Sequence, residues 1–440
     1  MHFGLVCPEM TGHLNPSLAL GRAVARRGHA VTVITSPRAR AKVEAAGLLF
    51  HAIGEKEASE GRTEKALAKL ATLRGMAALF YTGFLLRKAA EIHFRDLPPL
   101  LEDAQFDGLI VDQAYPAAAL VAERRDLPYV VICNALAIHY DPICPPPPTL
   151  WRYRTDLMGR IRNPLTLALL PRFFNALTGA GRLDVSPLAL SFPKPRRGLA
   201  HVAQQPAFFD FPRVGLPDHF HYSGPWHEPE RDDGLDFPWD WLDGRPLVYG
   251  SLGTIQNGTT HAYQAMAEAV RDLDVQFVIA LGRADAERSM NVPPNVLIVP
   301  YAPQLRLLER AAAAITHAGY NTAIECLAAG VPMVCLPVAN DQPGVARRVE
   351  WVGAGEVLPI RKVSAKRLRS LLQRVLNEPS YRKAALRCRD EIRKVDGAAV
   401  AAEIIAGAFK SGEPVLRKAM DSRGDSRSGS PAFSPRSETC

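Results

Sequence analysis

A histidine and an aspartate in the first quarter of the chain have the side chains that general base catalysis requires. His13 stands in the turn-like segment Pro8-Glu-Met-Thr-Gly-His-Leu-Asn-Pro16, directly after an apolar run. An imidazole titrates near neutral pH and can take a proton from a hydroxyl group. Asp112 ends the apolar run from Gly108, and a carboxylate on the far ring nitrogen would orient such a histidine. Each residue alone also fits a structural role, in a turn or at a strand end.

Two glycine-bearing turns in the second half of the chain could bind an anion such as a diphosphate. Each follows an expected strand and offers hydroxyls, amides or backbone N–H groups, the second of them at a helix start. The residues concerned are Ser251 and Thr254 in the first turn, and His317, Gly319, Asn321 and Thr322 in the second. Asn and Thr are also ordinary N-cap residues, so each turn alone has an explanation without a ligand.

Carboxylates and amides that could hold hydroxyl groups lie close to these turns. Glu325 falls one helical turn after Asn321, where it could accept two hydrogen bonds from a ribose diol. Asp341 and Gln342 follow the next expected strand and could hold sugar hydroxyls. A solvated helix acid and turn-forming residues are the plainer alternatives. Three polar segments at successive strand ends favour one shared site.

Strands and helices alternate along the chain, which indicates an α/β protein with parallel sheets. The chain opens with a strand to Pro8, a turn over Met10 to Pro16, a helix from Ser17 to Arg27 and a strand over Ala30 to Thr35. A second alternating series begins at Pro246. We predict two Rossmann-like, doubly wound domains that face each other across a cleft. Their expected ranges are 1–225 and 241–410, with a linker at 226–240 and a largely disordered tail at 411–440.

Length and composition fit this organisation. The 440 residues suffice for two domains, and 47% hydrophobic with 22% charged residues is ordinary globular usage. A net charge of +8 suits a nucleic acid, an acidic membrane or a phosphorylated ligand, but no basic helix is interleaved with aromatic residues as nucleic-acid binding would require. Seven widely spaced cysteines without a C-x-x-C pair, and no signal peptide, favour a cytoplasmic protein with buried, reduced thiols.

Four parts of the second half together resemble the nucleotide-sugar signature of UDP-glycosyltransferases. They are Tyr301-Ala-Pro-Gln304, His317-Ala-Gly-Tyr-Asn-Thr322, Glu325 and Asp341-Gln342, with the spacing of the family. Within the family the sequence is most similar to the bacterial zeaxanthin (carotenoid) glucosyltransferases, through segments at 108–116, 251–256, 341–346 and 412–416. The resemblance therefore covers most of residues 1 to 416.

This resemblance implies the GT-B fold, an acceptor-binding first domain and a nucleotide-sugar-binding second domain. It implies that Tyr301 stacks on uracil, where the family often has tryptophan, so the stack is weaker and base choice looser. The other implied donor contacts are Ala302 and Gln304 at the base or ribose, Glu325 at the ribose, Ser251, Thr254, His317, Gly319, Asn321 and Thr322 at the diphosphate, and Asp341 and Gln342 at the sugar. Glutamine in the last position is associated in the family with glucose. His13 and Asp112 match its catalytic dyad.

The expected reaction is an inverting transfer of glucose from UDP-glucose, by a hexosyltransferase that uses no cofactor. Deprotonated by His13, the acceptor hydroxyl would attack the anomeric carbon opposite the diphosphate. No D-x-D pair ends a strand, since Asp272-Leu-Asp274 precedes its strand, so we expect metal independence. The expected acceptor is a hydroxylated carotenoid such as zeaxanthin.

Several alternatives remain open at this stage. A glycosyltransferase of a macrolide, flavonoid or other small natural product would share every motif. A nucleotide-sugar epimerase would need more carboxylates around the sugar, and a non-catalytic nucleotide-sugar-binding protein would lack the dyad. The apolar runs at 75–86 and 164–170 stand beside basic residues, including the arginines from 152 to 162. They fit either peripheral contact with the inner face of a membrane or core helices that line an acceptor pocket.

Overall fold

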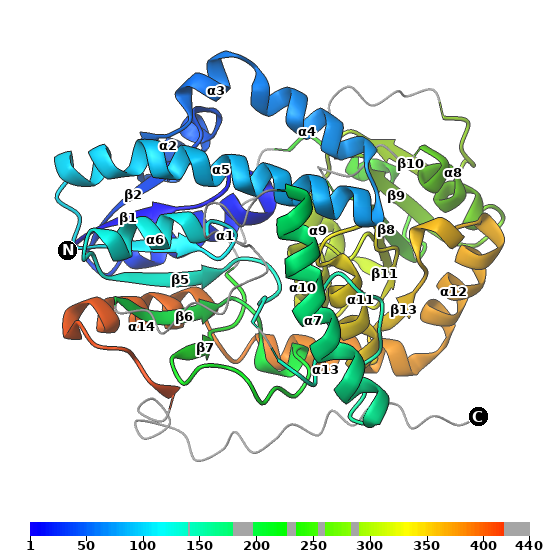
Figure 1. The fold of residues 1–440 in the computed structure, drawn as a ribbon. Helices are drawn as coiled ribbons and strands as arrows, with labels where there is room; N and C mark the ends of the chain where they lie inside the picture. Colours follow the sequence, from blue (N-terminus) through cyan, green and yellow to red (C-terminus); the bar gives the residue numbers. More distant parts are fainter. Residues whose placement is uncertain (140, 179–196, 227–234, 254–259, 283–289, 418–440) are drawn as a thin grey trace.

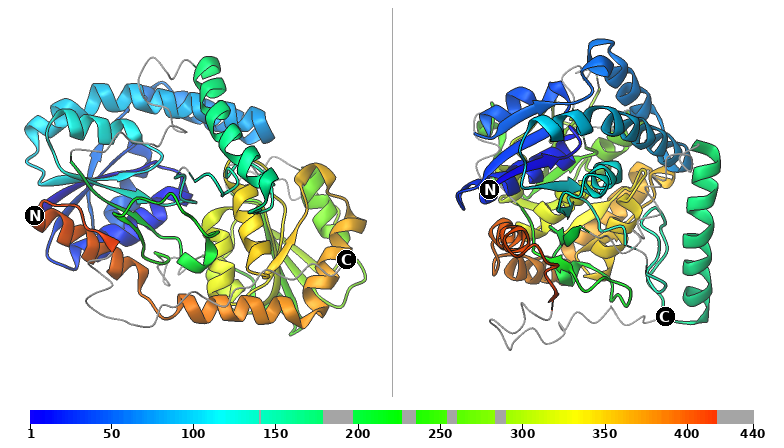
Figure 2. Two further views of the ribbon diagram at one scale, coloured as in Figure 1. Left: turned by 60° about the horizontal axis from the view of Figure 1, so that its bottom comes forward. Right: turned by 60° about the vertical axis from the view of Figure 1, so that its left-hand side comes forward.

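The computed structural model of the chain describes residues 1–139, 141–178, 197–226, 235–253, 260–282 and 290–417, and for residues 170–178 it describes the backbone alone. Most of the predicted linker and of the predicted tail lies outside these ranges. The described part contains two parallel sheets, each covered by helices (Figures 1 and 2). Six of the seven cysteines are described, and all six are buried and free, as predicted.

The first sheet has seven strands in the order β3-β2-β1-β4-β5-β6-β7, all paired in parallel. Helices α1 and α14 cover one face, and α5 and α6 cover the other. Because the strand order reverses between β1 and β4, the loops after these two strands diverge and leave room for a ligand. The strands are β1 (His2–Val6), β2 (Ala30–Thr35), β3 (Leu49–Ala52), β4 (Gly108–Asp112), β5 (Tyr129–Cys133), β6 (Gly198–Ala203) and β7 (Phe220–Tyr222). The helices are α1 (Thr11–Ala25), α2 (Arg40–Ala45), α3 (Glu55–Ser59), α4 (Arg62–Thr72), α5 (Gly75–Asp103), α6 (Pro116–Arg124) and α7 (Leu157–Thr178).

The second sheet has six parallel strands in the order β10-β9-β8-β11-β12-β13. Its switch point lies between β8 and β11, so the loops after these strands border the second half of the site. The strands are β8 (Leu247–Ser251), β9 (Gln276–Ala280), β10 (Val296–Val299), β11 (Ala311–Thr316), β12 (Met333–Cys335) and β13 (Gly355–Val357). The helices are α8 (Thr260–Ala269), α9 (Gln304–Leu308), α10 (Tyr320–Ala328), α11 (Gln342–Trp351), α12 (Ala365–Asn377) and α13 (Pro379–Ile392). Short 3₁₀ turns lie at Pro37–Ala39, Ala207–Phe209, Trp239–Trp241 and Ile360–Lys362.

The last helix, α14 (Gly397–Ser411), returns to the first sheet (Figure 2). Its apolar side joins the core under β1 and β2, where Phe409 stacks on Phe3 with ring centroids 4.5 Å apart. The two connections between the halves cross at Gly397 and Gly224, where a Cβ on Gly397 would come within 2.3 Å of the Gly224 carbonyl oxygen. Only glycine permits this approach. The sequence-based boundary at residue 410 does not anticipate this return.

The first helix also begins earlier than predicted. The sequence predicts a turn over Met10 to Pro16, but α1 runs from Thr11 and contains Pro16. Pro16 lies one turn inside the helix, where its missing N–H leaves the Gly12 carbonyl without its partner within the helix. His13 therefore lies in the first turn of a helix and not in an open turn.

Candidate active site

His13 and Asp112 lie together where β1 and β4 end. The Nδ1 atom of His13 is 2.7 Å from Oδ2 of Asp112. Asp112 is fully buried, whereas the His13 side chain keeps 21% of its surface exposed. Their adjacency follows from the parallel pairing of β1 with β4, which brings the carboxyl ends of both strands to one edge. The structure thus brings the predicted pair into contact.

Two further groups hold the Asp112 carboxylate in place. Asn134 donates from Nδ2 to Oδ2 at 2.7 Å, and the Ala114 N–H donates to Oδ1 at 2.7 Å. The same Asn134 amide donates to Ser17 Oγ at 2.8 Å. A carboxylate fixed in this way orients the imidazole, with Nδ1–H toward Asp112 and Nε2 left to accept a proton. Sequence reasoning missed Asn134 and Ser17; the position of Asn134 just after β5 was the available signal.

The surroundings of His13 shift its pKa upward. Burial lowers the pKa of the imidazole, but the charges of Asp112 and Asp341 and the hydrogen bond to Asp112 outweigh it and raise the pKa above its ordinary value of 6.5. A base of raised pKa is a stronger proton acceptor. Asp341 belongs to the second half of the chain, so both halves contribute to the electrostatics of this histidine.

The predicted anion-binding turns lie side by side in the second half. Ser251 ends β8 and is paired in register with Thr316 at the end of β11, and the His317 N–H donates to the Ser251 carbonyl at 3.3 Å. The His317 ring lies against two glycines: a Cβ on Gly253 or Gly319 would come within 2.7 or 2.4 Å of its Nε2. Burial lowers the pKa of His317 to about 4, so the ring is neutral at neutral pH. Thr254 lies outside the described residues.

The N-terminus of α10 offers backbone donors beside these turns. Gly319 precedes the helix in extended conformation, and the first backbone bond of this turn runs from the Ala323 N–H to the Gly319 carbonyl at 3.0 Å. The N–H groups of residues 320 to 322, Thr322 included, come before that bond and point out of the helix end. The N-cap position is taken by Gly319, and Asn321 and Thr322 lie inside the helix, so the N-cap explanation considered for these two residues is wrong.

Asn321 instead connects the two halves. It donates from Nδ2 to the Gly12 carbonyl at 2.6 Å, and its Oδ1 accepts from Gln204 Nε2 at 2.9 Å. The Gly12 carbonyl is available because its partner within the helix would be the N–H of Pro16, which proline lacks. This contact places the N-terminal end of α10 beside the helical turn that carries His13.

Base and ribose contacts are predicted at Tyr301, Ala302, Gln304 and Glu325. The Tyr301 ring is 49% exposed and thus open to stacking, while Ala302 packs against the core of the second half. Gln304 donates to the Glu325 carboxylate and accepts from the Tyr249 hydroxyl at 2.9 Å. Glu325 is only 3% exposed, so it is not the solvated helix acid considered as the alternative.

Asp341 and Gln342 play different structural roles. The Asp341 carboxylate accepts from the Leu136 N–H of the first half at 3.4 Å, and burial raises its pKa. Although Asp341 precedes α11, its side chain makes no capping hydrogen bond. Gln342 closes its own loop, since Oε1 accepts from the N–H groups of Val338 at 2.8 Å and Ala339 at 3.0 Å. The alternative considered from the sequence, that these residues form a turn, therefore applies to the side-chain oxygen of Gln342.

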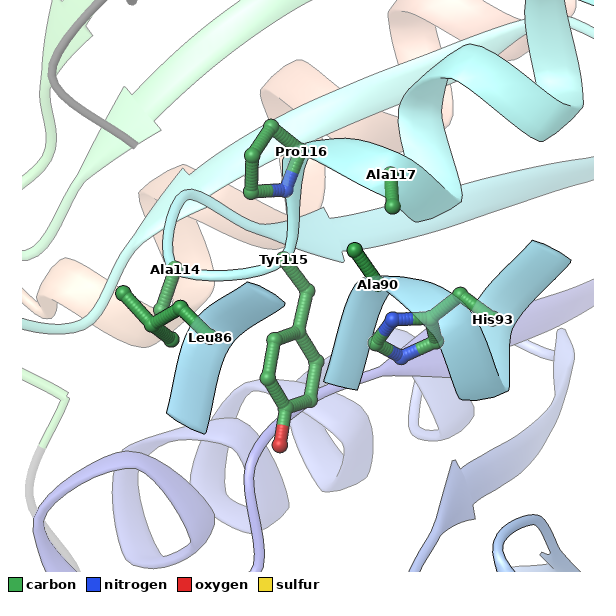
Figure 3. A pocket seen from close by; sticks show the side chains of 7 residues that line it. All are labelled: Leu86, Ala90, His93, Ala114, Tyr115, Pro116 and Ala117. Carbon is green, nitrogen blue, oxygen red and sulfur yellow. The ribbon is translucent and has the colours of Figure 1, made fainter. Parts of the chain in front are cut away.

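A small pocket adjoins the dyad on the first half (Figure 3). The ring of His93 stands edge-on to that of Tyr115, with centroids 4.4 Å apart. His93 is 1% exposed, and among the described residues neither of its ring nitrogens has a hydrogen-bond partner. Burial lowers the pKa of His93 to about 4, so it is a neutral polar group in an apolar wall. The pocket is lined by Leu86, Ala90, His93, Ala114, Tyr115, Pro116 and Ala117.

Comparison with known proteins identifies one matching family model and relatives that align with most of the chain. A family model described as UDP-glucoronosyl and UDP-glucosyl transferase matches residues 197–394. A zeaxanthin glucosyltransferase of Pantoea ananas is 28% identical over an alignment that covers 94% of this chain and 97% of the relative. The 4'-demethylrebeccamycin synthase of Lentzea aerocolonigenes is 29% identical, with 90% and 96% covered.

Solved structures share the architecture. The glycotransferase of kitacinnamycin superposes with a TM-score of 0.71 at 23% identity, covering 92% of this chain and 98% of that one. The glycosyltransferase VinC, solved in complex with dTDP, gives a TM-score of 0.61 at 22% identity, with 93% and 100% covered. Two parallel-sheet halves in this arrangement are the GT-B fold. Residues 197–394 thus match the UDP-glucoronosyl and UDP-glucosyl transferase family model, and over most of its length the chain is similar to glycosyltransferases.

Proposed function

We propose that the protein transfers glucose from UDP-glucose, with inversion, to a hydroxyl of an apolar acceptor, and that this acceptor is a hydroxylated carotenoid such as zeaxanthin. The observation that carries the proposal is the contact of Asn321 with Gly12, which sets the donor end of α10 next to the His13–Asp112 pair. In this proposal the first half binds the acceptor and the second half binds the nucleotide sugar.

The proposed chemistry assigns each group a step. His13 Nε2 takes the proton of the acceptor hydroxyl as its oxygen attacks the anomeric carbon, and Asp112 stabilises the imidazolium that forms. The backbone N–H groups at the start of α10, neutral His317 and Ser251 stabilise the charge on the departing diphosphate. Positioned base catalysis of this kind supplies about 10²- to 10⁴-fold in rate. We propose that neither a metal ion nor a cofactor takes part, so EDTA leaves the rate unchanged.

The donor contacts belong to the same proposal. Tyr301 stacks on the base, Ala302 and Gln304 approach the base and ribose, and Glu325 releases its bond to Gln304 to accept from the ribose hydroxyls. Asp341 and the Gln342 amide hold the sugar, since the Gln342 oxygen already serves its loop. Gly319, Asn321, Thr322 and Thr254 complete the diphosphate contacts.

Two classes of acceptor substrate are supported by the relatives. The zeaxanthin glucosyltransferase relative supports a carotenoid. The 4'-demethylrebeccamycin synthase relative, at similar identity, supports a different hydroxylated natural product. The dyad contact itself argues against a non-catalytic nucleotide-sugar-binding protein, because such a protein has no use for an oriented base.

The test is product mass after incubation with UDP-glucose and a panel of acceptors that includes zeaxanthin. We expect zeaxanthin to gain the mass of one or two hexosyl residues, and His13→Ala should lose this product while still binding UDP-glucose. Transfer only to another acceptor class would replace the carotenoid and keep the glycosyltransferase. A His13→Ala variant that retains full activity would contradict the assignment of His13 as the catalytic base.

A further inference from the structure

Helix α7 presents a stripe of apolar side chains to solvent. Leu157, Met158, Ile161, Leu165 and Leu169 are between 52% and 73% exposed. Four of them recur every fourth residue, which places them along one side of the helix. The opposite side is the packed one: Gly159 and Asn163 are buried, and the Asn163 amide donates to the Ile143 carbonyl at 2.9 Å. Figure 2 shows α7 along the outside of the molecule, and it packs against α5.

Arginines border this stripe on both sides. Arg160 and Arg162 precede and follow Ile161, and about 100° of rotation per residue puts them on opposite edges of the stripe. Among the described residues, neither guanidinium donates a hydrogen bond to a carboxylate: Arg160 bonds to the Thr155 carbonyl, and Arg162 to Asn163 and the Arg152 carbonyl. An apolar centre with cationic edges is the pattern of a helix that lies in a lipid interface.

The charge on both edges distinguishes between possible occupants of the stripe. If two copies of the chain paired through α7 by a twofold axis, the cationic edges of one helix would approach those of the other. An acidic lipid leaflet would neutralise both edges while its acyl chains received the apolar side chains. A membrane-spanning role is not supported, because within the described ranges no helix is long and apolar enough to cross a bilayer.

We propose that α7 docks the protein on an anionic lipid surface, with the stripe from Leu157 to Leu169 inserted among the acyl chains and Arg160 and Arg162 at the headgroups. The neighbouring helix α5 carries exposed Met76 and Phe84, and further along it lie Leu86, Ala90 and His93 of the pocket beside Asp112. Docking would therefore bring lipid close to the first half of the site. The inference does not depend on which acceptor is used.

Vesicle flotation tests the proposal on the full chain. Wild type should float with vesicles of an equimolar mixture of phosphatidylcholine and phosphatidylglycerol, and much less with phosphatidylcholine alone. Ile161→Glu/Leu165→Glu should lose flotation at least tenfold, since carboxylates would enter the acyl region and oppose the lipid charge. Arg160→Gln should weaken binding about fivefold, the effect expected of one basic residue at such a surface.

Matched controls separate docking from misfolding and from loss of catalysis. Val214→Glu changes another exposed apolar residue, 71% exposed, outside α7 and should float like wild type. The α7 double variant should keep its thermal unfolding midpoint and its turnover of a water-soluble acceptor. Flotation of that variant equal to wild type would overturn the proposal, as would a wild type that ignores anionic vesicles. A wild-type dimer that the double variant converts to monomer, with neither protein floating, would assign the stripe to a second copy instead.

Discussion

At the scale of single residues, the orientation of His13 depends on the Asp112 carboxylate, which is itself held by two further donors, the Asn134 amide and the Ala114 N–H. Asp112→Asn keeps the shape of the side chain but removes the charge that raises the His13 pKa. We expect kcat to fall by about 10²- to 10⁴-fold, with little change in the KM for UDP-glucose.

The pH profile of the same variant gives a sharper test. The acidic limb of kcat/KM reports deprotonation of the free histidine, so losing the negative neighbour should move this limb to lower pH. A limb that stays in place would show that His13 is not the titrating base. Asn134→Asp is not a suitable control because it adds a second charge beside Asp112. Ser17→Ala is better matched, since it removes the partners of the Asn134 amide and the Cys7 thiol but changes no charge, and it should leave the limb unchanged.

Sequence analysis identifies the site residues that stand in a recognisable local pattern, and misses those that long-range packing brings to the site. His13 and Asp112 each stand near a strand end, where the side chains of an α/β protein gather. Asn134 also follows a strand end, but its contact with Asp112 depends on how β5 packs beside β4, and His93, inside α5, has no comparable local pattern. A buried histidine with two unpartnered nitrogens is visible only in three dimensions.

At the scale of elements, Pro16 in α1 accounts for the hydrogen bond between Asn321 and the Gly12 carbonyl. No sequence pattern in either half predicts this contact. Pro16→Ala would restore an N–H to the Gly12 carbonyl, which would then compete with Asn321 for that acceptor. We expect the variant to fold and to lose about fivefold in kcat/KM, the equivalent of one ordinary hydrogen bond. Initial rates at varied UDP-glucose concentration measure this loss.

The control for this substitution is Pro99→Ala in α5, another proline within a helix that is not among the residues assigned to the site. It should leave kcat/KM unchanged. If Pro16→Ala were fully active, the Asn321–Gly12 contact would have no role in the reaction. The helix start was predicted six residues late for the same physical reason, because glycine at 12 and proline at 16 are typical of turns when read without their tertiary partners.

At the scale of the whole molecule, the division into two halves follows from the alternating pattern, but the contacts between the halves do not. The described beginning of the predicted tail also belongs to the first half, since the Val415 N–H donates to the Leu199 carbonyl at 3.0 Å. Helix α14 is as apolar as an ordinary core helix, so its sequence gives no sign of which sheet it covers. The two halves are therefore joined by a returning helix and by buried polar groups, both of which require the structure.

The strongest of these polar links is buried Arg348 of α11 with Asp210 of the first half. Arg348 donates to Asp210 Oδ1 from Nε at 2.9 Å and from Nη2 at 2.6 Å, while Arg213 Nε donates to Oδ2 at 2.8 Å. Burial raises the pKa of Asp210, but the two arginines outweigh it and lower the pKa to about 2. One buried anion thus balances two buried cations.

Because two buried cations share one buried anion, removing Arg348 and removing Asp210 should lower the free energy of unfolding by different amounts. Arg348→Met leaves Asp210 paired with Arg213 and should lower the free energy of unfolding by about 3 kcal/mol. Asp210→Asn leaves two buried guanidinium groups without a carboxylate and should lower it by about 5 kcal/mol or more. Urea denaturation, followed by tryptophan fluorescence, measures both, and the double variant should be more stable than Asp210→Asn alone because one unpaired charge is removed. The opposite order, with Arg348→Met the more damaging single change, would mean that stacking of the Arg348 guanidinium on the Phe211 ring, and not charge balance, holds the two halves together.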